Sequence, residues 1–68
     1  MEKKLPIGFI LSIAQNEQAL KYFANLDDMT KNRISNYIQD SITGEEAKER
    51  INISINGLEN NNLDFLTK

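Results

Sequence analysis

The sequence predicts an all-α fold, a compact bundle of four short helices followed by a short C-terminal tail. Apolar side chains recur every three or four positions along most of the chain. Residues that favour the start of a helix stand just before several of these apolar runs. With 68 residues, the chain is long enough for one domain, which we assign to residues 1–58, with a tail at residues 59–68.

The first predicted helix covers residues 6–15. Pro6 suits its first turn, where the N–H that proline lacks would have no partner. The apolar side chains of this segment, together with Leu5 just before it, are Leu5, Ile7, Phe9, Ile10, Leu11, Ile13 and Ala14. They surround nearly the whole helix, and a helix that is apolar on every side lies at the centre of a fold or against a partner.

The second predicted helix covers residues 17–25. Asn16 breaks the apolar pattern and is a favoured N-cap, and Glu17 complements the positive end of the helix dipole. The apolar face consists of Ala19, Leu20, Phe23, Ala24 and Leu26. Residues 6–25 form either two helices or one helix kinked near Asn16, and we favour two.

The third predicted helix covers residues 28–42. Asp27 is its natural N-cap, and Asp28 lies at the positive end of its dipole. The apolar residues with helical spacing are Met29, Ile34, Tyr37, Ile38 and Ile42.

The fourth predicted helix covers residues 44–56. Thr43 and Glu46 form a capping box, in which each side chain accepts a hydrogen bond from the other residue's N–H. Gly57 is a residue type that often ends helices in the left-handed conformation. The isoleucines of segment 51–55 alternate as in a strand, but the good helix formers before them favour a helix. In a helix, Ile53 packs on the first helix or on another subunit.

The composition argues against catalysis and metal binding. The chain contains no cysteine and no histidine, so the usual nucleophile–base pairs and structural zinc sites are missing. Its glycines are too isolated to form a phosphate-binding loop. We therefore expect no enzymatic activity, no catalytic residue, no cofactor and no metal.

Nucleic acids and membranes are also unfavoured partners. The net charge is −2, and the basic residues are scattered. As an alternative function, helices 28–42 and 44–56 resemble a DNA-binding helix-turn-helix pair, although Glu45, Glu46 and Glu49 at the start of the second helix would repel phosphate. Lys3 and Lys4 with the first helix suggest a membrane surface, but the apolar run is about half a membrane span. We expect a cytoplasmic protein.

The chain has more apolar surface than four short helices need, which favours a partner surface. The residues predicted for it are Ile7, Phe9, Ile10, Leu11, Ile53, Phe65 and Leu66. The leading hypothesis is a non-enzymatic protein-interaction module with a protein partner or a second copy of itself. In the tail, Leu63, Phe65 and Leu66 either dock as a short turn of helix or fray.

Two resemblances support a helical module. The stretch from Phe23 to about Asn60, with Tyr37-Ile38 and the run 46–51, resembles the C-terminal helical segment of the bacteriocin-protection (YdeI/OmpD-associated) family. The stretch from Leu11 to Ile34 resembles small bacterial proteins with an AQNxxAxxxFxxL pattern, which residues 14–26 match here. Together these resemblances imply an all-helical bacterial protein and imply no reaction or ligand.

Overall fold

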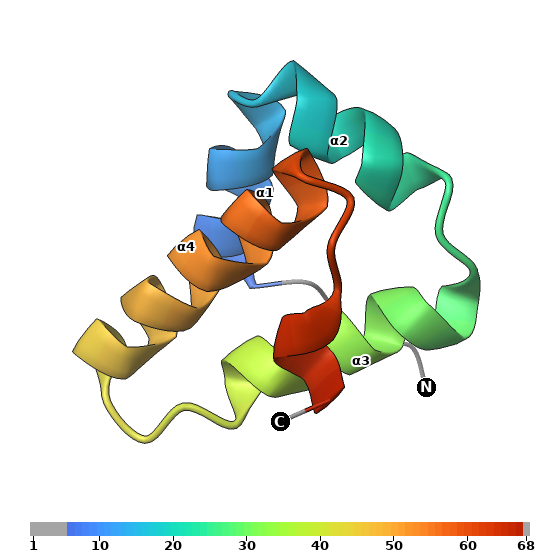
Figure 1. Cartoon of the computed structure of the whole chain (residues 1–68). Coiled ribbons are helices and arrows are strands. Elements are labelled where there is room, and N and C mark those ends of the chain that lie inside the picture. The colour runs from blue at the N-terminus through green and yellow to red at the C-terminus, as the bar shows by residue number, and fades with distance from the viewer. Residues whose placement is uncertain (1–5, 68) are drawn as a thin grey trace.

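The computed structural model of the chain describes residues 6–67 and consists of helices joined by short turns (Figure 1). In chain order these are α1 (Ile7–Ala14), α2 (Glu17–Ala24), α3 (Asp28–Gln39), α4 (Gly44–Glu59) and the 3-10 helix η1 (Asp64–Thr67). No strand forms within these residues, and the alternating isoleucines lie inside α4. The prediction of an all-α four-helix bundle is confirmed. The predicted roles of Lys3, Lys4 and Leu5 lie outside the described residues.

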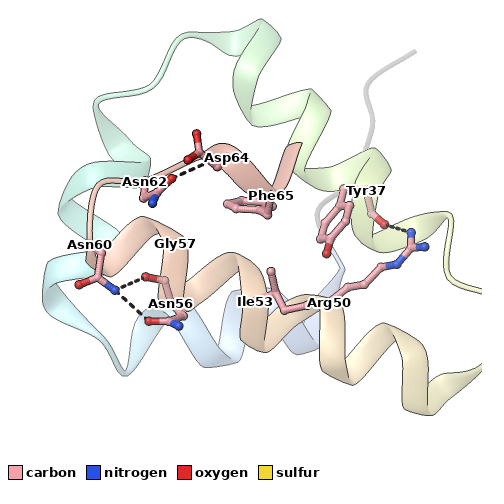
Figure 2. Close-up of a pocket in the computed structure, with 9 residues that line it drawn as sticks. All are labelled: Tyr37, Arg50, Ile53, Asn56, Gly57, Asn60, Asn62, Asp64 and Phe65. Atoms are coloured by element: carbon pink, nitrogen blue, oxygen red, sulfur yellow. Dashed lines mark hydrogen bonds between the residues drawn. The ribbon is translucent and has the colours of Figure 1, made fainter. Parts of the chain in front are cut away.

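Helix α4 is the centre of the arrangement, because it contacts α1, α2, α3 and η1. Figures 1 and 2 show α1 and η1 on opposite sides of α4. The radius of gyration is 10.9 Å, and a folded domain of this length is expected at about 11 Å. Among residues 6–67, each helix is too short or too polar to cross a lipid bilayer.

Three helices begin at the predicted capping residues. The side-chain oxygens of Asn16, Asp27 and Thr43 each accept a hydrogen bond from the N–H three residues later, at 3.1, 3.2 and 3.1 Å. These bonds satisfy N–H groups that have no partner inside the helix. Asn16 has an extended backbone, so α1 and α2 are separate helices.

The second half of the predicted capping box differs in detail. Glu46 Oε1 accepts from the N–H of Ile42 at 3.0 Å, one residue before the predicted donor Thr43. Its Oε2 lies 3.0 Å from Nη2 of Arg50, one turn further along α4. Glu46 therefore joins the start of the helix to a cation in its second turn.

The predicted end of the third helix is wrong. Helix α3 ends at Gln39, and Ile42 lies in the linker with 90% of its surface exposed. Met29 is also 71% exposed, so the predicted apolar face of this helix contributes only its middle residues to the core.

The predicted end of the fourth helix is wrong as well. Helix α4 continues through Gly57 to Glu59, and Asn61 adopts the left-handed conformation with φ of 53°. The N–H of Asn62 donates to the Gly57 carbonyl at 2.7 Å, and the N–H of Asn61 donates to the Leu58 carbonyl at 3.1 Å. This pair of bonds is a Schellman motif, in which asparagine takes the position that glycine usually fills.

The core lies where α1, α2 and α3 meet α4. Its buried apolar residues are Phe9, Ile13, Ala19, Phe23, Ile34, Ile38 and Leu58. The rings of Phe9 and Phe23 meet edge to face, with centroids 5.4 Å apart. Ser54 is also buried, and its hydroxyl donates to the Arg50 carbonyl at 2.8 Å.

The C-terminal tail docks on the bundle. Helix η1 contacts α3 and α4, and Leu63, Phe65 and Leu66 pack against the core. The Phe65 ring lies 5.4 Å from the Tyr37 ring of α3. Of the two predicted states of the tail, the structure therefore contains the docked one.

Candidate functional site

One candidate surface is an exposed apolar face of α1, formed by Ile7, Ile10, Leu11 and Ala14, which we call the α1 stripe. The spacing of these residues places them on one side of the helix. Ile7, Ile10 and Leu11 are 75%, 44% and 59% exposed. The opposite side of α1 carries the core residues of this helix.

The α1 stripe has no charged residue beside it on its own helix, since α1 reads IGFILSIA. A large apolar side chain gains about 1.5–3 kcal/mol when it moves from water into an apolar contact. Single exposed apolar residues are common on protein surfaces, whereas contiguous apolar patches mark interaction sites. The α1 stripe is therefore a surface suited to an apolar partner.

The structure divides the residues predicted for a partner surface into three groups. Ile7, Ile10 and Leu11 lie together on the α1 stripe. The prediction for Phe9 is wrong, because this ring is fully buried and faces the bundle. The other three predicted residues lie elsewhere, with Ile53 on α4 and with Phe65 and Leu66 on η1.

A second candidate surface is a groove between α3, α4 and η1, with a volume of about 600 Å³ (Figure 2). We call it the tail groove. Its lining residues are Tyr37, Arg50, Ile53, Asn56, Gly57, Asn60, Asn62, Asp64 and Phe65. Its volume is within the range of about 300–1,000 Å³ that is typical of ligand sites.

One end of the tail groove is apolar. Ile53 is 39% exposed and points toward the rings of Tyr37 and Phe65 (Figure 2). Ile53 was predicted to pack on the first helix or on another subunit. Its side chain lines this groove, and Ile51 is the isoleucine that approaches α1, since a Cβ placed on Gly8 would lie 3.1 Å from Ile51 Cδ1. A contact of Ile53 with another subunit stays a prediction.

The other end of the tail groove is lined by side-chain amides. Asn60 Nδ2 donates to both the backbone oxygen and Oδ1 of Asn56, each at 2.9 Å. Asn62 Oδ1 accepts from the N–H of Asp64 at 2.9 Å (Figure 2). These bonds hold three amides in fixed positions at this end of the groove, with Asn56 and Asn60 on the α4 side and Asn62 on the tail, where together they offer donors and acceptors.

Arg50 is held by several contacts at the apolar end of the tail groove. Its Nη1 donates to the Tyr37 carbonyl at 2.6 Å, and its guanidinium carbon lies 4.9 Å from the centroid of the Tyr37 ring. Its Nη2 pairs with Glu46 at 3.0 Å. The positive charge of Arg50 is therefore matched by a carboxylate of the same helix.

Gly57 allows the tail to form the far wall of the groove. A Cβ at this position would lie 2.5 Å from the backbone oxygen of Asn62 and 2.6 Å from the Phe65 ring. A real side chain does not fit in that space. The close approach of the tail to α4 therefore requires glycine here.

Sequence reasoning singled out Ile53 and Phe65 but missed most of the tail groove. One signal was present in the sequence, because Arg50, Ile53, Gly57 and Asn60 recur at helical spacing. They form a second face of α4, of mixed polarity, beside its apolar face. The contribution of residues 62–65 depends on how the tail docks, which no local pattern indicates.

Within residues 6–67, no group of three metal-ligating side chains comes together. The pKa of Asp27 is held below its usual value by hydrogen bonds from the side chain and then the backbone of Thr30, which fits its role as a helix cap. The exposed Glu45 and Glu49 at the start of α4 make the α3–α4 pair poorly suited to contact with phosphate.

Comparison with known proteins found no matching protein-family model, curated protein or solved structure.

Proposed function

We propose that this chain is a non-enzymatic protein-interaction module that self-associates through the α1 stripe. The observation that carries the proposal is the exposure of Ile7, Ile10 and Leu11 on one face of a helix without charge. The other face of α1 is already fixed to the bundle by Phe9 and Ile13. The stripe is thus apolar surface that the core formed by residues 6–67 leaves exposed.

A second copy of the chain is a suitable partner for this stripe. In a dimer with twofold symmetry, the same patch lies on both sides of the interface and must complement itself. Two charged stripes of one sign would repel each other, whereas two apolar stripes attract. Because the α1 stripe is apolar and uncharged, the stripe of one copy is complementary to the stripe of a second copy.

Self-association would also add to the stability of a domain this small. A core in a chain of this length supplies only a few kcal/mol of net stability. Any contact that forms only between folded copies adds to the free energy of unfolding. Because α1 has eight residues and is about 12 Å long, we expect a weak dimer with an interface below the standard size.

Sedimentation velocity over a range of protein concentrations tests the proposal. We expect the sedimentation coefficient of the wild type to rise with concentration as dimers form. Leu11→Asp places a charge in the stripe of both copies and should weaken the dimer at least about 100-fold, because a twofold interface loses one buried leucine from each copy. Ile42→Asp is the matched control, because Ile42 is 90% exposed and lies outside α1.

The control variant should associate like the wild type. A wild type that remains monomeric at every concentration contradicts the proposal. Equal association of the Leu11→Asp and Ile42→Asp variants would show that another surface forms the dimer.

A further inference from the structure

We propose that the tail groove binds a short, uncharged, extended peptide segment. One apolar side chain of the peptide lies between Tyr37, Ile53 and Phe65 at the apolar end of the groove. The backbone amides of the peptide pair with the asparagines at the other end. This site is separate from the α1 stripe and does not depend on self-association.

The apolar end of the groove has space for one side chain of the peptide. Ile53 keeps 39% of its surface exposed although half-buried aromatic rings stand beside it. An aliphatic side chain placed here covers the isoleucine and contacts the edges of both rings. The gain comes from apolar surface that leaves water on both molecules.

The amide end of the groove matches a peptide backbone. Each backbone unit carries one donor and one acceptor, and each asparagine side chain carries both types as well. Asn56 and Asn60 stand one helical turn apart on α4, and Asn62 follows in the turn. Because Asn60 Nδ2 already donates to Asn56 and Asn62 Oδ1 already accepts from Asp64, the groups that face a peptide are Asn60 Oδ1 as an acceptor and the Nδ2 groups of Asn56 and Asn62 as donors.

The charges around the groove favour an uncharged ligand. The guanidinium of Arg50 is paired with Glu46 and also donates to the Tyr37 carbonyl. At the other end, Asp64 contributes one exposed carboxylate. An anion such as phosphate would face Asp64 and would compete with Glu46 for Arg50, so the groove lacks the cluster of cations that anion sites use.

The arrangement of the rings argues against a sugar, and the amides argue against an acyl chain. The guanidinium of Arg50 covers the Tyr37 ring at 4.9 Å, and Phe65 packs against the same tyrosine at 5.4 Å. The Tyr37 ring therefore has less open face on which a sugar ring could stack. An acyl chain would displace water from the three asparagine amides and would offer them no hydrogen bonds in its place.

The groove is held in shape by contacts within the chain. The Schellman motif, the Asn62–Asp64 hydrogen bond and the contact of the tail with Gly57 fix its walls. A preformed site loses little conformational entropy on binding. Since α4 separates α1 from η1 (Figure 1), a peptide in the groove and a second copy on the stripe can bind together.

An NMR titration of the full chain with N-acetyl-leucyl-alanine amide tests this site. We expect saturable shifts of the Ile53 δ-methyl signal and of the side-chain amides of Asn56, Asn60 and Asn62. For a ligand of this size, a dissociation constant on the order of 1 mM is expected. N-acetyl-glycyl-glycine amide has the same backbone without the apolar side chain and should bind at least about tenfold more weakly.

Two substitutions of isoleucine form the matched pair of variants. Ile53→Ser should weaken binding of the leucyl probe at least about tenfold. Ile42→Ser removes an equally large side chain from the α3–α4 linker and should leave binding unchanged. Ile53→Thr, which keeps the branched shape, replaces Ile53→Ser if the serine variant does not give a native spectrum.

Several results would overturn the proposal. These are shifts that do not saturate, equal binding of the two peptide probes, and equal loss of binding in the Ile42 and Ile53 variants. N-acetylglucosamine or hexanoate, tested in the same way, would overturn it by binding the groove more tightly than the leucyl probe. A dimer that forms as expected while the groove stays empty refutes the peptide site alone.

Discussion

The two sides of α4 hold their neighbours in different ways. On one side, α1 brings the fully buried Phe9 to the core, and Gly8 comes near the end of the Ile51 side chain. On the other side, η1 brings only the half-buried Phe65, and Gly57 faces the Asn62 carbonyl. The end of a flexible side chain therefore determines the fit on the α1 side, whereas the backbone of Asn62 together with the Phe65 ring determines it on the η1 side.

This difference determines how much each side tolerates change. The Cδ1 atom of Ile51 is the end of a flexible side chain and moves aside at small cost. The Asn62 carbonyl belongs to the turn that ends α4, where hydrogen bonds from two N–H groups hold the backbone. An atom added on the η1 side must therefore displace the tail itself.

Gly57→Ala is expected to have the largest effect. The added Cβ would lie 2.5 Å from the Asn62 oxygen, so the tail must leave α4. We expect the free energy of unfolding to fall by about 1–3 kcal/mol, the usual cost of overpacking, even though alanine favours the helix. Urea denaturation measures the loss, and hydrogen exchange of residues 61–67 reports the release of the tail.

Gly44→Ala is the control for Gly57→Ala. No atom lies within 4 Å of a Cβ at Gly44, so alanine there should raise the free energy of unfolding by about 0.4–1 kcal/mol. A Gly57→Ala protein that is as stable as the wild type, with its tail still protected, would show that the backbone fit is looser than described.

Gly8→Ala is expected to have a smaller effect. The Cβ would lie 3.1 Å from Cδ1 of Ile51, and this side chain can shift by a few tenths of an ångström. The gain in helix propensity offsets the cost of that shift, so we expect a change within about 0.5 kcal/mol of zero. Urea denaturation beside Gly44→Ala and Gly57→Ala should place this variant between the other two. A loss as large as that of Gly57→Ala would contradict the distinction between the two sides of α4.

The starts of α2, α3 and α4 could be predicted from sequence, whereas the ends of α3 and α4 could not. The side chains of Asn16, Asp27 and Thr43 cap the first turn through contacts three residues away, so the signal is local. The end of α4 depends on the tail: Gly57 looks like a terminator but lies inside the helix, where the tail needs the space. Its role as a close-approach residue appears only when residues 62–65 are in place.

The candidate surfaces, like the helix ends, depend on how the elements pack together as well as on local sequence. The sequence predicted that α1 has more apolar surface than the core needs, and Ile7, Ile10 and Leu11 are indeed exposed. It could not identify Phe9 as the buried residue, because a helix that is apolar on every side gives no indication of which face turns inward. That choice depends on where α2 and α4 pack. The tail groove, in turn, combines residues from three elements.

The smallest expected effect concerns the cap of α3 and the pH. Hydrogen bonds from Thr30, from its side chain and then its backbone, lower the pKa of Asp27 in the folded chain. A carboxyl group with a lowered folded pKa stabilises the fold above its unfolded pKa and loses that contribution as the pH falls through the folded pKa. Asp27→Asn keeps a good capping side chain but removes the charge. We therefore expect the free energy of unfolding of the wild type to fall slightly more than that of the variant between about pH 5 and pH 2.

Urea denaturation at a series of pH values measures this difference between the two proteins. The other carboxyl groups of the chain titrate in both proteins, so the difference between the two pH profiles isolates Asp27. Because Asp27 is exposed, the difference should shrink at high salt. Parallel profiles at low salt would mean that the cap acts through its hydrogen bond alone. A steeper fall in the variant would contradict the lowered pKa of Asp27.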